Sequence, residues 1–151
     1  TSVLRWLVRS RPQNLITGPV IYAMVLPLLA MDLCVSLYQW SCFPIYRIAR
    51  VRRADYIVYD RHRLAYLNGI EKFHCTYCAY GSGLMAYMGE ILSRTEQYFC
   101  PIKHAHQVLG THARYQRYLA FGQADDYAAR LEAYRVALAP AARAPVAPTA
   151  P

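Results

Sequence analysis

The most pronounced hydrophobic pattern in the sequence is an apolar run from Leu15 to Trp40, which carries a single charge at Asp32. No Lys or Arg occurs between Arg11 and Arg47. A helix needs about 20 apolar residues to cross a bilayer, and this run is longer. It is too long for a cleaved signal peptide, and no small-residue cleavage site follows it. The pattern therefore predicts a membrane segment over residues 15–45.

Two residues make this segment unusual. Pro27, near the middle, removes a helical hydrogen bond and predicts a kink. A carboxylate inside a bilayer costs about 2.5–3.5 kcal/mol on insertion scales, so Asp32 needs an explanation. Two explanations stay open. Asp32 lies close enough to an interface to be wetted, or it pairs with another subunit or lines a site.

Basic residues flank the run on both sides: Arg5, Arg9 and Arg11 before it, and Arg47, Arg50, Arg52 and Arg53 after it. Because arginines favour the cytoplasmic side, we expect one kinked span with the C-terminal domain in the cytoplasm. The alternative is a re-entrant hairpin folded at Pro27. Residues 1–14 are expected to form a basic helix at the interface. The residues expected to contact the membrane or a partner are Asp32, Trp40, Arg50, Arg52 and Arg53.

Helical periodicity dominates the rest of the chain, so the predicted fold class is all-α, with a small basic helical domain over 46–139. The elements we expect are a short extended segment over 54–60 and helices over 61–73, over 84–99 and from Asp125 or Asp126 to Ala139. Asp60 is the predicted cap of the first of these helices, and the YGSG sequence at 80–83 predicts a break. Residues 140–151 form an Ala/Pro-rich tail that cannot bury a core.

Composition supports a membrane protein rather than a nucleic-acid-binding one. The chain has 17 Lys and Arg against 9 Asp and Glu, with 14 Tyr. Such a basic, Tyr-rich protein suits either nucleic acid or an anionic membrane. The apolar run favours a lipid bilayer over nucleic acid as the partner. The odd number of cysteines, five, does not match a secreted disulfide framework.

The cysteines and histidines suggest one candidate metal site. Cys75-x-x-Cys78 and Cys100-x-x-x-His104 are two ligand pairs that together complete a tetrahedron around zinc, and iron is the other candidate ion. If the predicted helix over 84–99 is straight, it holds the two pairs at opposite ends. A joint site therefore requires this helix to be short or broken. The alternatives are a thiol or disulfide role and plain packing cysteines.

The phrases DRHRLAYLNGIEK, CTYCAYGSGL and RTEQYFCPIKHA fall within residues 18–105. In them the chain resembles a group of small, uncharacterised proteobacterial inner-membrane proteins. The resemblance implies a bacterial inner-membrane location and supplies no activity. We therefore expect an accessory or structural subunit of a larger inner-membrane complex of photosynthetic or respiratory type. The alternative is a metal- or thiol-dependent membrane protein that uses the Cys/His residues.

Overall fold

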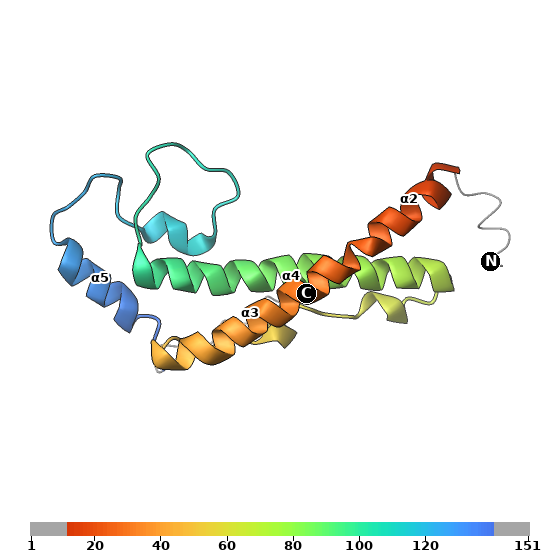
Figure 1. Cartoon of the computed structure of the whole chain (residues 1–151), viewed down its shortest axis with the longest axis horizontal. Coiled ribbons are helices and arrows are strands. Elements are labelled where there is room, and N and C mark those ends of the chain that lie inside the picture. The colour runs from red at the N-terminus through yellow and green to blue at the C-terminus, as the bar shows by residue number, and fades with distance from the viewer. Residues whose placement is uncertain (1–11, 141–151) are drawn as a thin grey trace. The chain divides into compact units, whose positions relative to one another are not determined.

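The computed structural model describes residues 12–140, and the all-α prediction is confirmed for them. The helices are α2 (Pro12–Ala23), α3 (Val25–Ile45), α4 (Gly69–Phe99) and α5 (Tyr127–Val136), with short 3₁₀ turns η1 (Arg53–Asp55), η2 (Arg61–Arg63) and η3 (Ala113–Arg117) (Figure 1). Within this part of the chain, β structure is limited to one bridge between Ile102 and Leu119. Most of the predicted interfacial helix and tail lies outside the described residues.

The described residues form two compact units. The first unit contains residues 12–36 and 52–88, and the second contains residues 37–51 and 89–140. α3 and α4 each contribute residues to both units.

The predicted kink is confirmed in the apolar run, where α2 and α3 form one long kinked helix that is interrupted only at Met24. Proline crowds the carbonyl four residues earlier, and for Pro27 this is Ala23, the last residue of α2. Helical bonding resumes at once, because the Leu28 amide donates to the Met24 carbonyl at 3.2 Å. The re-entrant hairpin is therefore not formed. Over Ile16–Ile45 the helix is long and apolar enough to cross a membrane.

α4 runs for 31 residues through the YGSG sequence, where we predicted a break, so this prediction is wrong. Gly83 serves close packing there, because a Cβ atom at this position would lie 2.6 Å from the Tyr56 carbonyl oxygen. The glycine permits this approach without ending the helix.

The helix predicted over 61–73 is also wrong, since only the turn η2 and the beginning of α4 form in this range. The effective cap is Asn68 rather than Asp60. The Glu71 amide donates to Asn68 Oδ1 at 2.8 Å, and the Asn68 amide donates to Glu71 Oε2 at 3.0 Å. This reciprocal pair is a capping box. Residues 57–60, which we expected to be extended, have no regular structure.

In the first unit, the first half of α4 packs against α2 and α3. The Tyr22 ring lies 5.3–5.6 Å from the rings of Phe73, His74 and Tyr77. The Tyr77 hydroxyl donates to the Ile21 carbonyl at 2.8 Å. Further along, a Cβ on Gly81 would lie at ordinary contact distance, 3.7 Å, from Leu28.

In the second unit, Phe43, Ile91 and Leu119 are fully buried and form part of its core. The last predicted helix forms as α5, slightly shorter than expected. It is tied to α4 by the Gln97 side chain, which donates to the Tyr134 carbonyl at 2.9 Å. The chain just beyond α5 is hydrogen-bonded to the segment that follows α3, because the Ala49 amide donates to the Leu138 carbonyl at 2.8 Å.

Replacing Gly83 with alanine should destabilise the protein by about 1–3 kcal/mol, because the new methyl group must displace the Tyr56 backbone. Gly81→Ala is the matched control, and it should be neutral or stabilising because its methyl fits and alanine favours helix. Urea unfolding of the detergent-solubilised chain measures both. Equal effects of the two substitutions would show that the close approach is not a constraint.

Candidate functional site

The polarity of α3 is the reverse of that of a helix on the surface of a water-soluble protein. Among its polar side chains, Asp32, Ser36 and Gln39 recur at helical spacing and are buried or partly buried, whereas Ser41 near its end is exposed. The stripe beside these polar residues is apolar and open, with Leu26, Leu33 and Trp40 exposed by 70%, 62% and 65%. We call this the lipid-like face, defined by Leu26, Leu29, Leu33, Leu37 and Trp40. No residue of α3 other than Asp32 carries a charge.

Asp32 is the centre of a polar cluster inside the first unit. Arg53 binds its carboxylate with two nitrogens, Nε at 3.2 Å from Oδ1 and Nη2 at 2.6 Å from Oδ2. The Tyr80 hydroxyl donates to Oδ2 at 2.9 Å. Ser36 lies 3.4 Å from both Oδ1 and the Tyr87 hydroxyl. The carboxylate thus has an arginine, a tyrosine and a serine as partners from three segments of the chain.

The cluster explains why Asp32 is tolerated in an apolar helix. A two-pronged arginine–carboxylate pair is among the stronger charge-assisted contacts. Its hydrogen bond to Asp32 raises the pKa of Arg53 further, so the arginine stays charged. Burial, together with the bond to Asp32, raises the pKa of Tyr80 to about 12 and keeps this hydroxyl a donor. Asp32 therefore has hydrogen-bond partners within its own chain.

Gln39 plays the same part in the second unit. Its amide oxygen accepts from the Val51 amide at 3.0 Å, and its amide nitrogen donates to the Val51 carbonyl at 3.2 Å. This buried side chain therefore pairs with the backbone N–H and C=O of Val51, which lies beyond the end of α3. Asp32, Ser36 and Gln39 thus each form hydrogen bonds within their own unit.

The other predicted membrane or partner residues are open to solvent. Trp40 and Arg50 are exposed. Arg52 makes only a long contact with Asp55, 4.0 Å, and the two side chains are 70% and 50% exposed. Arg53 is also exposed, with its side chain 45% open, but it is held by Asp32.

The predicted metal ligands are not brought together. Cys75 and Cys78 belong to the first unit, and Cys100 and His104 belong to the second. α4 is unbroken, and Phe99, its last residue, follows Cys78 by 21 positions, which is a rise of roughly 30 Å. The condition for a joint site, a short or broken helix, is therefore not met. Among residues 12–140, no three His, Cys, Asp or Glu side chains are grouped to hold a metal.

Glu90 forms a second charged cluster, which the sequence analysis did not single out. Arg94 donates to its Oε1 at 2.9 Å and Arg114 donates to its Oε2 at 2.8 Å. Burial opposes ionisation of Glu90, but the two arginines outweigh it and hold its pKa below the ordinary 4.5. The Glu90–Arg94 spacing of four residues was the available signal, whereas Arg114 is remote in sequence.

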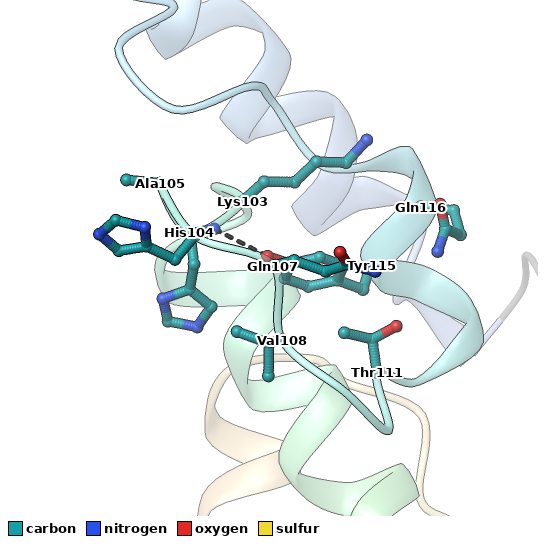
Figure 2. A pocket seen from close by; sticks show the side chains of 9 residues that line it. Lys103, His104, Ala105, Gln107, Val108, Thr111, Tyr115 and Gln116 are labelled. Carbon is teal, nitrogen blue, oxygen red and sulfur yellow. Dashed lines mark hydrogen bonds between the residues drawn. The ribbon is translucent and has the colours of Figure 1, made fainter.

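The second unit also contains a cavity of about 320 Å³ in the chain that follows α4 (Figure 2). It has no carboxylate in its lining, and its polar residues are Lys103, His104, His106, Gln107, Thr111, Tyr115 and Gln116. The Tyr115 hydroxyl accepts from the His104 amide at 2.8 Å and fixes the loop. This lining suits a small anion better than a metal, because it gathers only two imidazoles and no acid.

Asp32→Asn should destabilise the chain by about 1.5–3 kcal/mol, the usual cost of losing hydrogen bonds to a charged group. A double-mutant cycle with Arg53→Gln, read by urea unfolding in detergent, should give a coupling energy above about 0.5 kcal/mol. Arg52→Gln, the exposed neighbour, should change stability by less than about 0.5 kcal/mol. Additive single effects at positions 32 and 53 would contradict the pairing.

Glu90→Gln should remove part of the acid sensitivity of the fold. Because the pKa of Glu90 is lowered in the folded protein, its stabilising effect is complete above pH 4.5 and is lost as the pH falls through the folded value. Between pH 5 and pH 3 the variant should therefore lose less stability than the parent. Glu132→Gln, at an exposed carboxylate 3.7 Å from Arg135, should leave the parent slope unchanged. Unfolding midpoints across this pH range are the measurement.

No protein-family model, curated protein or solved structure matches the chain. The resemblance to the proteobacterial group stays a prediction.

Proposed function

We propose that this chain is a membrane-anchored accessory protein of the bacterial inner membrane that attaches its helical domain to the bilayer as part of a larger assembly. The observation that carries the proposal is the reversed polarity of α3. A water-soluble helix turns its charged residues outward, whereas α3 turns Asp32 and Ser36 inward and leaves its lipid-like face open. Exposed apolar area of this kind marks a membrane or protein contact.

Charge supports a lipid surface as the partner and the cytoplasmic side as the proposed side of the membrane. Arg47, Arg50 and Arg52 follow the helix and are exposed. Clusters of arginine beside an apolar helix favour the anionic cytoplasmic leaflet. We therefore place residues 46–139 on the cytoplasmic side.

Apolar residues away from α3 support a further protein partner. Leu109 is 89% exposed, and Phe121 and Val136 are also open, all in the second unit. A bilayer contact through α3 does not require them. Side chains of this size are commonly buried when a subunit joins its complex. Native co-purification should therefore recover the chain in a larger, stoichiometric complex, and a lone stable chain with an activity of its own would contradict the accessory role.

The anchor can be tested with two charges on the lipid-like face. The double variant Leu29→Lys/Leu33→Lys should reduce binding to vesicles at least ten-fold. Binding would transfer each lysine from water into the bilayer, and the cost of this transfer opposes insertion. Leu109→Lys is the control, since it adds charge at an exposed leucine outside α3. Flotation of the full chain with vesicles of phosphatidylcholine and phosphatidylglycerol measures both. Unchanged binding of the double variant would refute α3 as the anchor.

A further inference from the structure

The chain after α3 approaches that helix again in the first unit, and it does so without regular structure. Arg53 lies in the turn η1 and binds Asp32. Residues 56 and 57 then contact α4, since a Cβ on Gly83 would meet both Tyr56 and Ile57 within 3.1 Å. The segment from 52 to 63 includes exposed charges at Arg52, Asp55, Asp60, Arg61 and Arg63. We call residues 52–63 the return segment.

The depth of Asp32 along the apolar helix determines the depth of the return segment. Asp32 lies 16 residues after Ile16 and 13 before Ile45, the ends of the apolar helix. At 1.5 Å per residue it is roughly 24 Å and 20 Å from these ends. If the helix crossed the bilayer, Asp32 would therefore lie near the middle of a hydrocarbon core that is about 30 Å thick.

A crossing helix would then carry the return segment into the hydrocarbon. Arg53 is fixed to Asp32, and the exposed Arg52 and Asp55 are within two residues of it. Irregular backbone and exposed charges do not occur in lipid-facing positions at this depth, because nothing there can hydrogen-bond to them. The contacts within the first unit are thus incompatible with a simple crossing.

We propose that α2 and α3 lie along the surface of an anionic bilayer, with the lipid-like face immersed and the return segment in the headgroup layer and water. This inference rests on the proposed membrane anchor and specifies its orientation. A helix in this position immerses its apolar face by about 5–10 Å. The lipid-like face has no charge, and Asp32 is turned toward Arg53 instead. The chain has 17 basic and 9 acidic residues, and this excess of positive charge favours anionic headgroups.

Tryptophan depth distinguishes the two orientations. Leu26, Leu33 and Trp40 are spaced by seven residues and share one face of α3, so an in-plane helix holds all three at one depth. A crossing helix separates neighbours in this series by about 10 Å along its axis. The probes are Leu26→Trp and Leu33→Trp in a Trp6→Phe/Trp40→Phe background, and native Trp40 in Trp6→Phe. A fourth, Val58→Trp in the tryptophan-free background, reports on the return segment.

Each full-length variant is bound to vesicles of phosphatidylcholine and phosphatidylglycerol with bromine at one of several acyl carbons, after circular dichroism has shown native helicity. We expect the three α3 tryptophans to show the same depth of quenching, within about 3 Å, and the tryptophan at 58 to be quenched several-fold less. Graded depths on α3, with strong quenching at 58, would overturn the in-plane orientation and leave the anchor intact. Absence of vesicle binding would refute the anchor itself, and the orientation with it.

Discussion

The pairing of Asp32 with Arg53 is the constraint on which the first unit depends. A mostly buried aspartate in a long apolar helix is costly when it is unpaired, and Arg53 offsets that cost. Together they neutralise each other, accept the Tyr80 hydroxyl into the same cluster and fix where the chain returns after α3. The apolar helix can then have one polar face and one entirely apolar face. The pair therefore establishes the asymmetry on which the proposed anchor role of α3 depends.

Local patterns predicted the elements that local forces determine. The apolar run, the kink at Pro27, the end of α4 before Pro101 and the helix after Asp126 were all predictable from neighbouring residues. The continuity of α4 was not, because the glycines at 81 and 83 have the same local signature as a turn. What distinguishes them is a tertiary contact, the approach of Tyr56 to Gly83, which no local pattern contains. The Asn68–Glu71 capping box was a local signal, and it was overlooked.

The candidate sites likewise depend on contacts that local sequence patterns do not contain. The Cys75-x-x-Cys78 and Cys100-x-x-x-His104 pairs have the spacing of metal ligands, but spacing alone could not show that an unbroken helix lies between them. The polar clusters around Asp32 and Glu90 join residues that are 21 and 24 positions apart along the chain. Nothing in the sequence pairs a particular arginine with a particular carboxylate when several of each are present. Such long-range partners become visible only once the fold is known.

The separation of Asp32 and Arg53 by 21 residues has a consequence for the synthesis of the chain. Ribosomes add about 5–20 residues per second, so the arginine appears about 1–4 seconds after the aspartate. Tyr80, the other main partner, follows later still. During that interval the nascent helix exposes its whole apolar surface together with an uncompensated carboxylate. The polar side of α3 is therefore complete only after both Arg53 and Tyr80 have been synthesised.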